Sequence, residues 1–136
     1  MKKDKLNELF QLQKKFDRQL AKKRNLYYPQ IFKRQEKNRF SLQSEWILML
    51  SRAIQHELME IEDLLPWKWW KNYGSIDDDV IKAIKEELID ILHFWLSMCH
   101  KLDMTPDEVM KIYKEKNKEN FDRQNGKSIR TGYKSK

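Results

Sequence analysis

The chain has 136 residues, of which 36% are charged and 40% are hydrophobic, so its length fits one folded domain with one core. The single cysteine, Cys99, excludes an internal disulfide and a cysteine-based zinc cluster, and its place in an apolar run predicts a small buried thiol. No apolar stretch is long enough to span a bilayer, and the first residues lack the apolar run of a signal peptide. We therefore expect a cytoplasmic protein with no membrane partner.

Charge is distributed unevenly along the chain. The formal net charge is +7, with lysine and arginine concentrated in residues 1–39 and 111–136 and acidic residues concentrated between them. A basic balance favours anionic partners, namely nucleic acid, acidic lipid or a phosphorylated small molecule.

Few turn signals interrupt the chain, because only three glycines and three prolines occur, and this favours a few long helices. Apolar residues at helical spacing predict a first helix over residues 4–22, followed by a polar connector over 23–40. A second helix is predicted from Ser41, which can cap it, to about Leu65, because Pro66 follows.

The remainder of the chain predicts two more helices. Residues 67–74, WKWWKNYG, form a turn-like segment, and the serine and three aspartates that follow favour a third helix over about residues 75–102. The motif T-P-D-E at residues 105–108 is a capping box with proline at the first helical position. It opens a fourth helix that reaches about Phe121.

The predicted fold class is all-α, a compact bundle of about four to five helices in a single domain over residues 1–136, with a basic, partly flexible tail from about residue 122. The third helix is apolar on nearly every side over residues 80–99, which leaves little polar face for solvent. We therefore expect a second copy of the chain to cover it, in a homodimer with a two-fold interface.

Four carboxylates occupy positions where the helical pattern demands buried residues. Glu57 and Glu60 continue the apolar stripe of the second helix, and Glu87 and Asp90 continue that of the third. Spacing i, i+3 puts each pair on one helix face, so two facing helices would assemble an oxygen-rich site. Such a site suits Mg²⁺, or Mn²⁺ as a substitute, since both share coordination with phosphates. The alternative is that these acids are exposed and paired with lysines.

Three further groups of residues can recognise a nucleotide. The tryptophans of residues 67–74 are either core residues or a stacking surface for a base. His93 and Phe94 supply either core packing or a hydrogen bond and an apolar wall. Three polar residues share one face of the fourth helix: Lys116, Asn120 and Arg123. They form either a solvated surface or a triphosphate site.

Three stretches, HELMEIEDLLPWKWWK, EELIDILHF and KEKNKENFDRQNG, combine the motifs E-x-x-E, W-K-x-W-K, E-x-x-D-x-x-H-F and K-x3-N-x2-R. This combination resembles the dimeric all-α dUTP diphosphatases, or dUTPases, within the MazG-like all-α NTP pyrophosphatases. The likeness runs from LFQLQKKFD to RQNG. Relatives in this group tend to be longer, with helices inserted after the third helix that this chain lacks.

The resemblance implies Mg²⁺-dependent hydrolysis of dUTP to dUMP and pyrophosphate, with dUDP as a further candidate substrate. It implies that four carboxylates bind the metal: Glu57, Glu60, Glu87 and Asp90. Glu60 would also be the base that accepts a proton from the attacking water. Deoxyuridine would be enclosed or recognised by five residues: Gln13, Trp70, His93, Phe94 and Asn120. Phosphates would be held by Lys116, Arg123 and either Lys127 or Tyr133.

Two alternatives stay open. A pyrophosphatase of this kind can act on another nucleotide, such as dCTP or a damaged triphosphate. A non-enzymatic helical protein that binds nucleic acid or regulates another protein would use the acids as structural ion pairs. Such a protein has no reason to place four acids on core stripes, so nucleic acid is the less favoured partner.

Overall fold

The structure, a computed structural model, describes residues 4–26 and 42–130. Within these residues it contains four α-helices and no strand: α1 (Lys5–Arg24), α2 (Leu42–Leu64), α3 (Asp78–Lys101) and α4 (Pro106–Gln124). The predicted all-α fold class is confirmed for the described residues. The chain divides after Asp103 into two compact units, the first containing α1 to α3 and the second containing α4.

Local signals determine where three of the helices begin. Three side chains cap helix starts: Asp4 for α1, Asp77 for α3 and Thr105 for α4. Each accepts hydrogen bonds from backbone N–H groups two or three residues later, at 3.0–3.3 Å. The predicted cap of α2, Ser41, lies outside the described residues. The fourth helix ends at Gln124, three residues beyond its predicted end.

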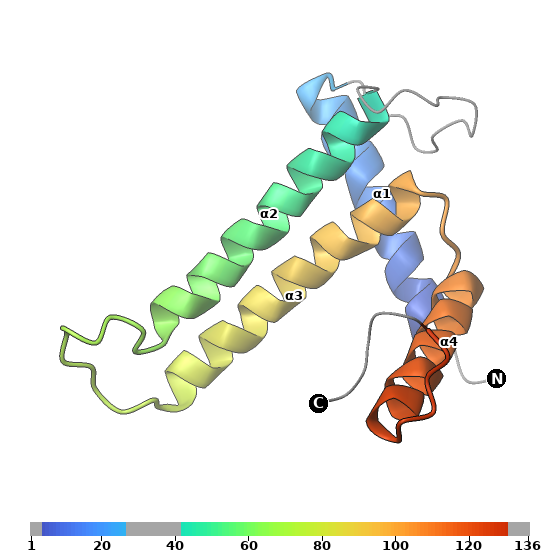
Figure 1. Ribbon diagram of the computed structural model, residues 1–136. Helices are drawn as coiled ribbons and strands as arrows, with labels where there is room; N and C mark the ends of the chain where they lie inside the picture. The colour runs from blue at the N-terminus through green and yellow to red at the C-terminus, as the bar shows by residue number, and fades with distance from the viewer. Residues whose placement is uncertain (1–3, 27–41, 131–136) are drawn as a thin grey trace. The chain divides into compact units, whose positions relative to one another are not determined.

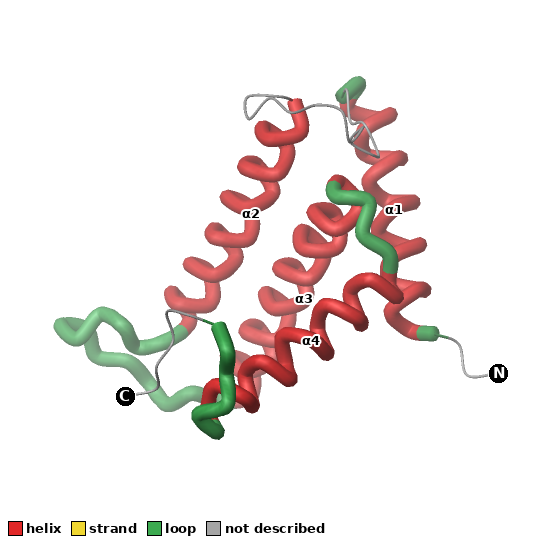
Figure 2. Tube along the Cα trace, turned by 45° about the vertical axis from the view of Figure 1, so that its right-hand side comes forward, coloured by secondary structure: helices red, strands yellow, loops and turns green. Residues whose placement is uncertain are grey.

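In the first unit, α2 and α3 run side by side in opposite directions, joined by residues 65–77 (Figures 1 and 2). Helix α1 packs against α3. Among the described residues of this unit, four apolar side chains are buried: Phe10, Leu50, Leu96 and Cys99. Phe10 of α1 contacts the rings of Trp95 and His100 edge-on, with centroids 6.4 and 5.2 Å apart. The core therefore lies where α1 meets the C-terminal half of α3.

The predicted buried thiol is confirmed. Cys99 is 3% exposed, and burial raises its pKa to about 11. Since the thiolate is the reactive form, little of it is present at neutral pH.

Large apolar side chains remain exposed along the α2–α3 pair: Leu48, Met49, Leu58, Met59, Ile81, Leu88 and Ile89. A helix that faces water normally presents a polar stripe there, so this surface is unusual for an isolated helix pair. Among the described helices, none is long and apolar enough to cross a membrane.

Lys101, the last residue of α3, is fully buried. Its Nζ lies 5.2 Å from the centroid of the Trp46 ring, an arrangement that suits a cation–π contact. Burial lowers the pKa of this amine from 10.5 to about 8, although the charge of Asp17 acts in the opposite direction.

This lowered pKa predicts how stability changes with pH. Between about pH 8 and 10.5 the unfolded chain keeps the Lys101 proton and the folded protein has lost it, so the contribution of this group to stability rises with pH. We expect Lys101→Met to raise the Tm most below pH 8 and to lose this advantage as the pH approaches 10.5. Thermal unfolding across this range tests it, with the exposed Lys85→Met as control. An advantage of Lys101→Met that does not vary with pH would contradict it.

Candidate active site

Helices α2 and α3 bring three of the predicted carboxylates together. Glu57 of α2 and Glu87 and Asp90 of α3 each have an oxygen within 4.8 Å of the other two. Glu57 and Glu87 are half-buried and Asp90 is exposed. The i, i+3 spacing places the two α3 acids on one face, which is turned toward α2.

Glu87 is the acid whose charge is least well accommodated. Its Oε2 is buried and has no hydrogen-bond partner among the described residues. Burial raises the pKa of this carboxyl most, followed by a hydrogen bond with Glu57 and by the charges of Glu60, Glu57 and Asp90. A buried carboxylate oxygen beside two other carboxylates fits a hard divalent cation, whose preferred ligands are oxygens. The donor set therefore suits Mg²⁺.

Glu60, the fourth predicted ligand, is not part of this group of three. It is exposed, and its Oε1 lies 3.1 Å from Nε2 of His56, one turn earlier on α2. Its charge still contributes to the raised pKa of Glu87. Glu60 thus lies at the edge of the carboxylate group.

A cavity of about 400 Å³ opens beside these acids, lined by residues from α1, α2 and α3. Six polar residues contribute to its lining: Gln13, Asp17, Glu57, Asp90, His93 and Ser97. Three aromatic residues contribute as well: Phe16, Trp46 and Phe94. Three of the five predicted deoxyuridine contacts, namely Gln13, His93 and Phe94, therefore line the same cavity as two of the carboxylates.

A hydrogen-bonded group in the cavity wall joins α1 to α3. The Gln13 amide nitrogen donates to Asp17 Oδ1 at 3.0 Å and to Ser97 Oγ at 3.2 Å. The Ser97 hydroxyl donates to Asp17 Oδ2 at 2.8 Å. Gln13 and Ser97 are buried, so these bonds satisfy groups that water does not reach.

Asp17 and Ser97 were not among the site residues predicted from the sequence. The sequence pattern could have indicated Asp17, because this residue follows Gln13 by one helical turn and lies on the same helix face. No local pattern indicates Ser97, since its hydrogen-bond partner on α1, Asp17, lies 80 positions away in the sequence.

Trp70 lies outside the lining of the cavity. It is 59% exposed and contacts the rings of Trp67 and Trp69 edge-on, with centroids 6.1 and 5.7 Å apart. Trp67 is anchored by its Nε1, which donates to Asp63 at 3.1 Å, while Lys68 Nζ lies 4.9 Å from the Trp67 ring. These residues form an aromatic cluster of their own after α2.

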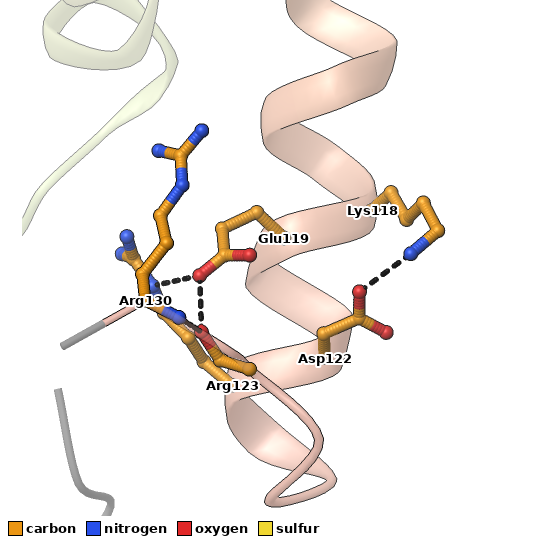
Figure 3. Close-up of polar contacts among 6 residues, drawn as sticks. Lys118, Glu119, Asp122, Arg123 and Arg130 are labelled. Carbon is orange, nitrogen blue, oxygen red and sulfur yellow. Dashed lines mark hydrogen bonds and ion pairs between the residues drawn. The ribbon is translucent and has the colours of Figure 1, made fainter.

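The predicted phosphate residues belong to the second unit, where Glu119 holds the end of α4 (Figure 3). Glu119 accepts hydrogen bonds from Arg123 Nε at 3.0 Å and from the Ser128 hydroxyl. The Ser128 bond lowers the pKa of Glu119 most, and the Arg123 bond and charge add to it. One turn of α4 also carries an ion pair between Lys118 and Asp122 at 2.7 Å.

Arg123 is consequently engaged with Glu119 within its own unit. The other predicted phosphate residues of this unit, Lys116 and Lys127, are exposed, and so is Asn120, which was predicted to contact deoxyuridine. Tyr133 lies outside the described residues.

A family model described as dUTPase matches residues 5–105, which include all three helices that line the cavity. The chain belongs to the dUTPase family. Every residue of the carboxylate group and of the Gln13 network falls inside the matched span. In this dUTPase-family chain, α4 lies beyond it.

Two curated relatives are similar to part of this dUTPase-family chain. The dCTP pyrophosphatase of Enterobacteria phage T4 is 42% identical over 67 residues, and the dCTP pyrophosphatase of Enterobacteria phage LZ5 is 39% identical over 67 residues. Each match covers 43% of this chain and 39% of the relative, so the chain matches about two fifths of the length of these relatives. No solved structure matches.

The environment of Glu87 predicts that its charge destabilises the metal-free protein. Its raised pKa means that the favourable protonated form is lost as the pH rises through the folded pKa. We expect Glu87→Gln to have a higher Tm than the native sequence at pH 7 in the presence of EDTA. The difference should shrink as the pH falls toward 4.5, the ordinary value.

The matched control is Glu62→Gln, which changes an exposed glutamate of α2 outside the carboxylate group. Differential scanning calorimetry of both variants makes the comparison. A Tm for Glu87→Gln at or below that of the control would show that the carboxylates do not repel one another as described.

Proposed function

We propose that this chain hydrolyses a pyrimidine deoxynucleoside triphosphate, dUTP in the first place, to the monophosphate and pyrophosphate. One observation carries the proposal: a single cavity is lined both by carboxylates of the cation-binding type and by the buried amide of Gln13. The first feature suits a triphosphate and the second suits the edge of a base. Membership of the dUTPase family and the similarity to two dCTP pyrophosphatases support nucleotide pyrophosphatase activity.

Glu57, Glu87 and Asp90 would hold Mg²⁺, and Glu60, whose charge acts on Glu87, is the further candidate ligand. A bound Mg²⁺ supplies charge neutralisation for the phosphates and a lower pKa for water in its coordination shell. The buried Oε2 of Glu87, which has no partner among the described residues, supports this assignment.

Glu60 is proposed as the base that accepts the proton of the attacking water. It is exposed, so a water molecule can reach it, and His56 at 3.1 Å can hold its carboxylate in position. The water oxygen forms a new bond to the phosphorus of the α-phosphate. The bond from that phosphorus to the bridging oxygen breaks, and pyrophosphate leaves.

The aromatic side chains of the cavity would enclose the base. Phe16, Trp46 and Phe94 come from three different helices and line the same space. Thymine differs from uracil by one methyl group, so a close-fitting wall is the physical means of rejecting it, worth ~1–3 kcal/mol.

A second candidate substrate is dCTP. The similarity to two phage proteins favours it, since each of them is a dCTP pyrophosphatase. Cytosine and uracil have the same ring size, so the aromatic walls do not distinguish them.

We expect pyrophosphate release from dUTP or dCTP in the presence of Mg²⁺ and none in the presence of EDTA. Glu60→Gln and Asp90→Asn should each lower turnover by at least roughly a hundredfold, because each removes a charge that acts in the transition state. A panel with dTTP and dATP measures base selectivity.

Glu62→Gln serves as the control and should keep normal turnover. Near-normal turnover in Glu60→Gln or Asp90→Asn would contradict the assigned roles. Salt-sensitive binding to DNA without release of pyrophosphate from any nucleotide would favour the non-enzymatic alternative.

We also propose that the active species is a homodimer. The exposed apolar side chains of the α2–α3 pair support it, since a second copy about a two-fold axis would remove them from water. The masses to be distinguished are 16.8 kDa for one chain and twice that for two.

Sedimentation equilibrium at micromolar concentration should give the mass of two chains. Replacing Leu88, an exposed apolar residue of α3, by Lys should shift the population toward one chain, because a charge would then lie in the interface. The exposed Lys85→Ala on the same helix is the control. A single species at 16.8 kDa for the native sequence would refute the dimer.

A further inference from the structure

Three side chains in the cavity wall close a ring of hydrogen bonds between α1 and α3. Gln13 donates from its amide nitrogen to both Asp17 and Ser97, at 3.0 and 3.2 Å. Ser97 donates its hydroxyl proton to the second oxygen of Asp17, at 2.8 Å. Gln13 is 7% exposed and Ser97 is 2% exposed, so the ring is shielded from water.

The chemistry of these partners determines which end of the Gln13 amide faces them. An ionised carboxylate only accepts hydrogen bonds, so the NH₂ end of Gln13 must face Asp17. The Ser97 hydroxyl gives its one proton to Asp17 and therefore accepts from Gln13. Both amide hydrogens are thus in use, and a flipped amide would set its oxygen against a carboxylate oxygen.

The carbonyl oxygen of Gln13 is the remaining polar atom of this side chain. No hydrogen bond to it is found among the described residues, and Gln13 lines the cavity that also contains Glu57 and Asp90. Toward a molecule in the cavity, this residue can therefore act only as an acceptor. Uracil presents a matching donor at N3–H. Cytosine has an acceptor at N3, and its donor is the neighbouring 4-amino group.

We propose that Asp17 and Ser97 are positioning residues that hold Gln13 with its carbonyl oxygen toward the base, so that the cavity selects pyrimidines that present an N–H donor there. This inference rests on the proposed hydrolysis of a pyrimidine nucleotide. Beyond that function, Asp17 and Ser97 would control, through Gln13, how strongly the cavity prefers a base with an N–H donor.

The test compares dUTP with N3-methyl-dUTP, in which the N3–H donor is replaced by a methyl group. Pyrophosphate release gives kcat and KM for the native sequence, Ser97→Ala, Gln13→Ala and the double variant. We expect Ser97→Ala to raise the KM for dUTP by roughly two- to tenfold, the range of one neutral hydrogen bond, with kcat nearly unchanged. The preference for dUTP over the methylated nucleotide should fall by a similar factor, since a released amide can turn its NH₂ toward O4 or O2.

The double variant separates positioning from a structural role. If Ser97 acts through Gln13, Ser97→Ala adds nothing in the Gln13→Ala background. Asp17→Asn should also lower the preference for dUTP, because an amide at position 17 can pair with either end of Gln13. Ser51→Ala, a half-buried serine of α2 outside the cavity lining, is the control and should leave the preference intact.

Several results would overturn the inference while the proposed function stands. These are equal use of both nucleotides by the native sequence, an unchanged preference in Ser97→Ala, or additive effects in the double variant. If the native sequence prefers dCTP, the same comparison uses dCTP and its N4,N4-dimethyl analogue. Release of pyrophosphate from neither dUTP nor dCTP would overturn the proposed function, and this inference with it.

Discussion

The close approach of three carboxylates on α2 and α3 is the constraint on which the packing of the first unit depends. Glu57, Glu87 and Asp90 approach within 4.8 Å, and one Glu87 oxygen is buried without a partner among the described residues. In the absence of a counter-ion their repulsion pushes the two helices apart. The opposing attraction between α2 and α3 comes from the other end of the pair, where Leu50 of α2 and Leu96 and Cys99 of α3 are buried and Lys101 of α3 lies over the Trp46 ring of α2. The acids therefore do not displace the main apolar core, and the cavity can form beside them.

The boundary between α1 and α3 is unusually polar for the interior of a small helical unit. Gln13, Ser97 and Lys101 are all buried there, and Asp17 lies among them with hydrogen bonds to two of the three. Buried polar groups of this kind tolerate few alternative arrangements, because a one-residue shift of α1 would leave several of them without partners. Apolar contacts alone would permit such a shift more easily. The polar ring thus determines the register of α1 on α3 as well as the orientation of one amide.

Much of the fold could be predicted from the sequence because its signals are local. The caps at Asp4, Asp77 and Thr105 act within three residues, and the acids at 57, 87 and 90 were in register with apolar stripes. Interactions between distant residues were harder to predict. Residue spacing does not tell whether the Glu60 carboxylate pairs with His56 on its own helix or joins the other acids. The hydrogen bond from Ser97 to Asp17 links residues 80 positions apart, so no local pattern indicates it. The placement of Trp70 outside the cavity depends on the path of residues 65–77, for which the sequence offered no periodic pattern.

The cavity combines one part whose residues are close in sequence with another part that is distant from it in sequence. The carboxylates belong to the α2–α3 hairpin, which residues 65–77 close. The Gln13 amide belongs to α1, and its hydrogen bond to Ser97 of the hairpin links residues 84 positions apart. Closing a short loop costs less conformational entropy, so the α2–α3 hairpin with its carboxylates can assemble before α1 docks and completes the cavity. The same separation has an evolutionary consequence. Under the proposed function, substitutions confined to α1 can alter which base is accepted and leave the proposed metal-binding acids untouched, so a lineage can change its substrate by remodelling a single helix.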